Sequence, residues 1–261
     1  MDQVDKSEVL ASLEKTPETF YKGFNDFVRD NPELVKKSEE ELERVLLGAS
    51  PEDMTRVMEA RNLFSYGIYL ARNLYPSVTS SIMPEVVVEQ LPWQGGGYIE
   101  SQVRDDNPNR IILGIDYLFE HSYNKESSSS PSPILNVEGI GAYVLTATEE
   151  YAHCVLRNLK SSEQQQKILK ETETTSSKAN AVAEELYHAR DNNQPVDYFK
   201  TVNEQRRWYR SSRPEFSAVI WRQKMVRDYV PWMKDAESVR GNTREQVAPF
   251  RREIISKTNS T

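Results

Sequence analysis

The sequence predicts an α+β protein that is mostly helical, with a small, partly antiparallel sheet packed on one of the helices. Apolar residues recur at three- and four-residue spacings over the first and last parts of the chain, which is typical of amphipathic helices. β-Branched runs gather only between residues 84 and 115, which indicates a few short strands. Hydrophobic residues make up 38% of the 261 residues, enough for a packed core.

Helices are expected throughout the first 76 residues. Proline stands at positions 17, 32 and 51, where the first turn of a helix tolerates its missing N–H group. Each proline follows a residue that can cap a helix, namely Thr16, Asn31 and Ser50. The third helix should extend from Pro51 to about Tyr75, because Pro76 follows. We therefore expect a helical N-terminal region over residues 1–76.

Three short strands are expected next. They are EVVVEQ at 85–90, YIESQV at 98–103 and RIILGI at 110–115. The turn-forming sequence DDNPN at 105–109 joins the last two strands, which favours antiparallel pairing between them.

Helices are expected again from Gly139 onward. Their ranges are 139–159, 174–191, 196–211 and 214–239. The polar sequence DNNQP at 191–195 separates the second of these helices from the third. We expect a central region over residues 77–195 with the three strands and two helices. A basic helical region with a disordered tail should then occupy residues 196–261.

The charge distribution favours docking of the C-terminal region on the remainder of the chain. Residues 1–189 carry 18 basic and 31 acidic side chains, whereas residues 190–261 carry 15 and 9. A phosphate or anionic lipid surface around Trp208 is the alternative use of the basic residues. The overall formal charge of −7 argues against nucleic acid as the partner.

Several features predict a cytoplasmic protein without a signal peptide or transmembrane segment. The single cysteine, Cys154, cannot form an internal disulfide. The first ten residues are acidic where a secretory signal would be basic. No apolar run approaches the ~20 residues that span a bilayer. The alternative to a cytoplasmic location is export by a system that needs no such signal. The sequence does not indicate the oligomeric state.

The candidate chemistry lies beside two of the three histidines. The sequence EEYAH covers Glu149 to His153, and EELYH covers Glu184 to His188, both within expected helices. Residues four apart on a helix project from the same face. Glu149 and His153 can therefore point at one ion.

Residues 110–193 resemble the catalytic core of zincin metallopeptidases of the gluzincin kind. In that family a strand precedes a helix with the motif HExxH, and a second helix supplies a glutamate ligand. Here RIILGI resembles the strand, GAYVLTATEEYAHCVLRN the motif helix and ANAVAEELYHARDNN the glutamate helix. The motif departs from the family pattern at Glu149, where the family has its first histidine.

The resemblance implies roles for particular residues. Glu149, His153 and Glu185 would be the metal ligands, and Glu150 would be the general base that activates a metal-bound water. Glu184 is the alternative third ligand, because the register of the second helix is not fixed by the sequence.

Tyr187 and His188 would then lie behind the ligands or near the reacting oxygen. The implied function is a zincin-like, metal-dependent peptidase that acts on a peptide or protein substrate. Zinc is the expected cofactor, with manganese or iron as alternatives, because two carboxylates and a histidine form a hard site. An anionic ligand at position 149 raises the pKa of bound water, so a weakened or inactive enzyme is also consistent.

Two other functions use the same residues. A catalytically dead zincin-fold scaffold would need no cofactor and would bind a protein partner. A di-iron helical protein would use Glu150 with His153 and Glu185 with His188 as paired units. The short separation of these units leaves no room for the intervening helix of that fold.

Overall fold

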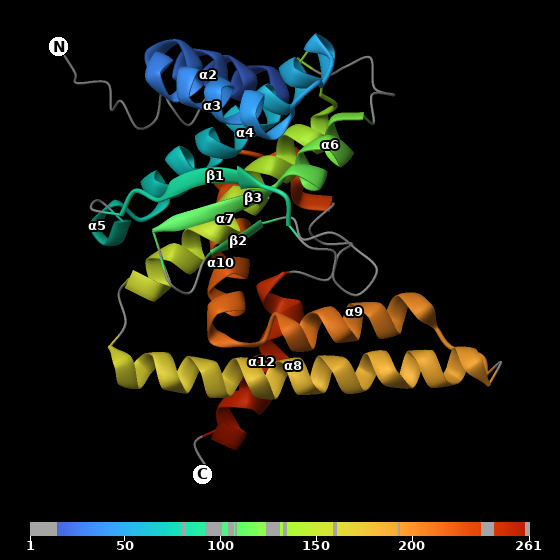
Figure 1. The fold of residues 1–261 in the computed structure, drawn as a ribbon. Helices are drawn as coiled ribbons and strands as arrows, with labels where there is room; N and C mark the ends of the chain where they lie inside the picture. The colour runs from blue at the N-terminus through green and yellow to red at the C-terminus, as the bar shows by residue number, and fades with distance from the viewer. Residues whose placement is uncertain are drawn as a thin grey trace.

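The computed structural model describes residues 15–79, 82–91, 101–103, 107, 109–123, 131–132, 135–158, 161–192, 194–235 and 243–258 (Figure 1). The described chain is mostly helical with one small sheet, which confirms the α+β class. No helix within these ranges is both long and apolar enough to cross a lipid bilayer.

The N-terminal region is helical, as expected. Its helices are α2 (Pro17–Asp30), α3 (Pro32–Val45), α4 (Pro51–Leu74) and the short α5 (Pro76–Thr79). The side chains of Thr16 and Ser50 cap α2 and α4 by accepting hydrogen bonds from Thr19 N and Asp53 N. Asn31 makes no such bond to α3, and its side chain donates to the Phe27 carbonyl instead.

The sheet has three strands in the order β1-β3-β2. The strands are β1 (Glu85–Glu89), β2 (Ser101–Val103) and β3 (Arg110–Gly114). β3 pairs in parallel with β1 over five residues and antiparallel with β2 over three. The sheet is therefore mixed, and its longer pairing is the parallel one. Residues 98–100 of the expected second strand lie outside the described ranges.

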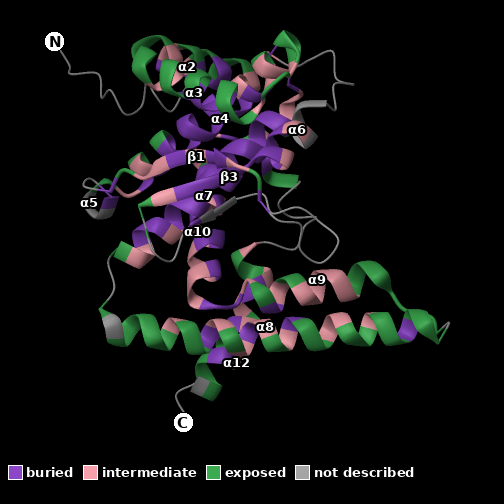
Figure 2. Cartoon of the chain, viewed as in Figure 1, coloured by how far each residue is buried: buried purple, intermediate pink, exposed green. Residues whose placement is uncertain are grey.

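Helix α7 (Val137–Asn158) lies at the centre of the molecule and is buried over most of its length (Figure 2). It packs against α4, against α10 (Arg213–Asp228) and beneath β2 and β3. Its approach to α4 is close at Gly67, where an added Cβ would lie 2.8 Å from the Ala147 Cβ and 3.0 Å from the Val144 Cα. The shorter α6 (Ile115–Tyr123) follows β3 directly.

Two long helices form an arm that extends across one end of the molecule (Figure 1). They are α8 (Ser162–Asp191) and α9 (Tyr198–Tyr209), which pack along each other. A small second hydrophobic cluster holds the arm to α12 (Arg244–Thr258) through Trp208, Ala179 and Ile254. α10 leads from this arm into the main core.

Three helix boundaries differ from expectation. α8 begins at Ser162 and not at 174, because Ser161 and Gln164 form a reciprocal cap there. α10 ends at Asp228 and not at 239, and a short 3-10 helix (Pro231–Met233) follows it. α12 is a further helix beyond 239, where the last expected helix ended within a region expected to be helical with a disordered tail.

Candidate functional site

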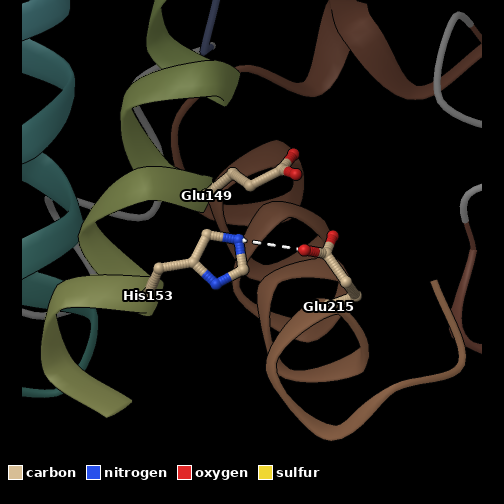
Figure 3. Close-up of side chains that lie close together, drawn as sticks. All are labelled: Glu149, His153 and Glu215. Carbon is tan, nitrogen blue, oxygen red and sulfur yellow. Dashed lines mark ion pairs between the residues drawn. The ribbon is translucent and has the colours of Figure 1, made fainter. Parts of the chain in front are cut away.

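Helices α7 and α10 bring three potential metal ligands together (Figure 3). Glu149 and His153 lie one turn apart on the face of α7 that is turned toward α10. Glu215 lies in the first turn of α10, two residues after the helix begins at Arg213. The positive end of the helix dipole favours a carboxylate at this position.

The three side chains converge on a small volume that is largely shielded from solvent. One ligand atom from each residue lies within 4.8 Å of the others, so the group could hold a metal ion. His153 Nε2 is 3.5 Å from Glu215 Oε1, and these two side chains are 14% and 11% exposed. Two carboxylates and an imidazole are donors that zinc, manganese and iron accept.

Two arginines occupy the same cluster and contact its carboxylates. Arg210 Nη1 forms an ion pair with Glu149 Oε1 and lies 2.9 Å from Glu215 Oε2. Arg222 Nη1, from the second half of α10, lies 2.5 Å from Glu149 Oε2. Both oxygens of Glu149 therefore have a guanidinium partner, and Arg210 bridges the two glutamates.

The electrostatics of the cluster keep both of these ion-pair partners charged. Burial on its own would raise the pKa of Glu149, but the nearby charges of Arg210 and Arg222 outweigh burial and hold that pKa well below its ordinary value. Burial would lower the pKa of Arg210, but the charges of Glu149 and Glu215 raise it further than burial lowers it. The two carboxylates of Glu149 and Glu215 are matched in formal charge by the guanidinium groups of Arg210 and Arg222.

This charge balance decides how well a metal ion fits. The donor types are suitable, and bound ligand atoms would have to lie about 2.0 to 2.2 Å from the ion. A divalent ion would add two positive charges next to two guanidinium groups that already balance the two carboxylates. Both arginines would have to release Glu149, and a buried charge without its partner is costly. In the observed arrangement, the residues therefore fit the arginines better than they fit a metal ion.

The predicted site residues divide between two places. Glu149 and His153 come together, and Glu150 is buried beside them on α7. Glu184, Glu185, Tyr187 and His188 are all exposed on α8. Among the described residues, none of these four belongs to the group of potential ligands that contains His153. The third carboxylate of that group is Glu215.

The sequence does not single out Glu215, because its partners are distant along the chain. The available signal was indirect. Glu215 follows Pro214 at the expected start of a helix. Arg210 lies just before that helix and Arg222 lies within it, so one glutamate and two cations are near each other in the sequence. Only the packing of α10 on α7 shows that Glu149 is their common partner.

Cys154 follows His153 in the chain but is fully buried and does not face solvent. Burial, together with the charge of Glu150, raises the pKa of its thiol to about 12. The thiol is therefore protonated at neutral pH and is a poor nucleophile.

Comparison with known proteins adds no relative: no family model, no curated protein and no solved structure matches this chain.

Proposed function

We propose that this protein is a non-catalytic, zincin-like interaction protein, in which an arginine–carboxylate cluster takes the place of a catalytic metal ion. The contact of Arg210 Nη1 with both Glu149 and Glu215 carries the proposal. A cation between two carboxylates is what a metal site requires, and here the cation is supplied by the chain itself.

The order of elements supports the zincin-like part of the proposal. A short sheet precedes α7, which carries EEYAH, and a later helix presents a glutamate to the histidine of that motif. In this arrangement α10 and Glu215 take the role that the sequence suggested for the helix with Glu184 and Glu185. The glutamate at position 149 then has a structural purpose, because it binds the two arginines that a first-position histidine would repel when protonated.

A second candidate function, a metal-dependent hydrolase, has one observation in its favour. Glu149, His153 and Glu215 are close enough to share an ion, and Glu150 is adjacent to them on α7. In that case Glu150 would be the general base of a peptidase. The hydrolase requires Arg210 and Arg222 to leave Glu149, whereas the interaction protein requires no rearrangement.

Metal content distinguishes the two functions. The full-length protein, purified without chelators and dialysed against zinc, manganese or iron(II), should retain less than about 0.1 equivalent of metal and cleave no casein or peptide-library substrate. Combining Glu149→His with Arg210→Gln and Arg222→Met should raise zinc retention toward one equivalent, because three neutral or anionic donors then face no competing cation.

The matched control is His188→Ala, which removes the exposed histidine of the second ExxH unit on α8. Stoichiometric metal in the wild-type protein that is lost in His153→Ala, but kept in His188→Ala, would overturn the non-catalytic proposal. Metal-dependent cleavage by the wild-type protein would do the same and would favour the hydrolase.

A further inference from the structure

The end of the arm, where α8 finishes and α9 begins, contains a hollow of about 390 Å³. Its walls are formed by six residues: Leu186, Tyr187, Arg190, Gln194, Val196 and Tyr198. This arm tip, defined by residues 184–200, is the end of the arm away from α10 (Figure 1).

The arm tip exposes large apolar and aromatic side chains close together. Tyr187 is 61% exposed, Tyr198 59% and the neighbouring Phe199 78%. Single exposed apolar residues are ordinary, but a group of aromatic residues around a hollow is typical of a surface that binds another molecule. Tyrosine supplies a large contact area at a low cost in side-chain entropy.

Among the described residues, Arg190 is the only charged one that lines the hollow. Within the described residues its side chain makes no ion pair or hydrogen bond. A purely apolar ligand would bury this guanidinium without a partner, which is unfavourable. A carboxylate would instead form a charge-assisted, bidentate contact with it.

Three exposed acidic residues, here called the acidic rim, adjoin the lining residues along the chain. Glu184, Asp191 and Asp197 are exposed and are close in sequence to lining residues. They would repel a ligand with several acidic groups and would attract basic groups on either side of a single carboxylate. One cation therefore lines the hollow, and in the chain beside it the acidic Glu184, Glu185, Asp191 and Asp197 outnumber the single further cation, Lys200.

We propose that the arm tip binds a peptide segment in which one acidic side chain adjoins a bulky apolar residue and basic residues flank the pair. The acidic group would contact Arg190, the apolar group would pack between Tyr187 and Tyr198, and the basic flanks would face the acidic rim. This inference rests on the proposed interaction function and names the chemistry of the partner.

Selection of a phage-displayed random dodecapeptide library on the immobilised full-length protein tests the proposal. The enriched peptides should contain Asp or Glu next to Trp, Phe, Tyr or Leu, with Lys or Arg nearby. A fluorescein-labelled copy of an enriched peptide should bind the wild-type protein in an anisotropy titration. Its Kd should rise about tenfold or more with Arg190→Gln and with Tyr187→Ser.

Two controls test whether the peptide binds at the hollow and whether its acidic group contacts Arg190. Leu169→Ser changes a residue that is 61% exposed on the same helix but lies outside the hollow, so it should leave the Kd unchanged. Replacing the acidic residue of the peptide by its amide should weaken binding to the wild-type protein but not to Arg190→Gln. Circular dichroism of each variant checks that the arm remains helical.

Several results would overturn the proposal: no enriched peptide, enriched peptides that are only basic, or equal binding to wild type and Arg190→Gln. A dimer seen by sedimentation velocity that Tyr187→Ser dissociates would assign the arm tip to a second copy of the chain instead. Failure of the proposed interaction function would give a different result. The protein would then retain metal and cleave a substrate, and both properties would depend on His153 and not on Arg190.

Discussion

At the scale of single residues, Glu149 has the largest influence on the cluster between α7 and α10. Both of its carboxylate oxygens contact an arginine, and its side chain is 13% exposed. Glu215 has only one of these arginines as a partner and also faces His153. Removing Glu149 therefore takes one carboxylate partner from both arginines. Removing Glu215 takes a partner from Arg210 only.

This asymmetry predicts how Glu149→Gln changes stability and its dependence on pH. At pH 7 the substitution should lower the free energy of unfolding by about 3 to 5 kcal/mol, the range for one broken buried ion pair. The folded state lowers the pKa of Glu149 below its ordinary value of 4.5. The stabilisation is therefore complete above about pH 4.5 and is lost as the pH falls toward the lowered pKa.

Urea unfolding of the wild-type protein and of Glu149→Gln between pH 7 and pH 3 measures this effect. The difference in unfolding free energy between them should shrink as the pH falls below 4.5. Glu184→Gln, on an exposed part of α8, should differ little from wild type at any of these pH values. A difference for Glu149→Gln that stays constant down to pH 3 would contradict the ion-pair assignment.

At the scale of elements, the contact between α4 and α7 depends on the absence of a side chain at Gly67. An alanine there would place its Cβ against Ala147 and against the backbone of Val144, which cannot move without shifting α7. Alanine would gain up to about 1 kcal/mol of helix propensity. The strain of overpacking, about 1 to 3 kcal/mol, should outweigh that gain.

We therefore expect Gly67→Ala to lower the thermal unfolding midpoint. Gly23→Ala in α2 is the matched control, because its added Cβ would meet only the hydroxyl end of the Tyr66 side chain. The control should be less destabilising, since a side-chain end can move more easily than a helix backbone. Differential scanning calorimetry measures the unfolding midpoints of the two variants. Equal midpoints would show that α4 and α7 can move apart at Gly67 without a larger loss of stability.

The elements were predictable where local chemistry defines them. The starts of α2 and α4 were predicted from a proline preceded by the capping residues Thr16 and Ser50. The strands β1 and β3 were predicted from β-branched runs. The first half of α8 was missed because it is largely exposed and shows no apolar stripe. α12 was missed for a similar reason, since it is polar and contains Pro249.

The candidate site was predictable only in part. The four-residue spacing placed Glu149 and His153 on one face of a helix, and this juxtaposition is observed. The third carboxylate and the two arginines come from a region that is distant in sequence, and no local pattern indicates which face of α10 meets α7. Long-range packing of this kind requires coordinates.

At the scale of the whole molecule, the described part of the chain has two hydrophobic clusters of very different size. The main cluster includes residues of α2, α4, α7, α10 and the sheet, whereas the second joins only Ala179, Trp208 and Ile254, with Val182 and Phe250 beside them. Ion pairs reinforce the smaller one, including Arg251 with Glu171 at 2.6 Å and Lys178 with Glu253 at 2.7 Å. The arm should therefore open at a lower free energy than the main core.

Hydrogen exchange followed by mass spectrometry tests this difference. Peptides from α9 and the last third of α8 should exchange sooner than peptides from α4 and α7. Trp208→Leu should hasten exchange in the arm while leaving α4 unchanged, because Trp208 packs in the smaller cluster against Phe250. Equal protection of the arm and α4 in the wild-type protein would show that the two clusters unfold together.

The two arginines that share Glu149 also limit how this chain can change during evolution. A neutral residue at 149 would remove a carboxylate partner from both arginines and leave Arg210 with Glu215, while loss of one arginine leaves the other paired with Glu149. A histidine at position 149 would face the same two guanidinium groups, so this substitution should be less costly when positions 210 and 222 also change. In any lineage descended from this protein, an acidic residue at 149 should be inherited together with arginine at 210 or 222.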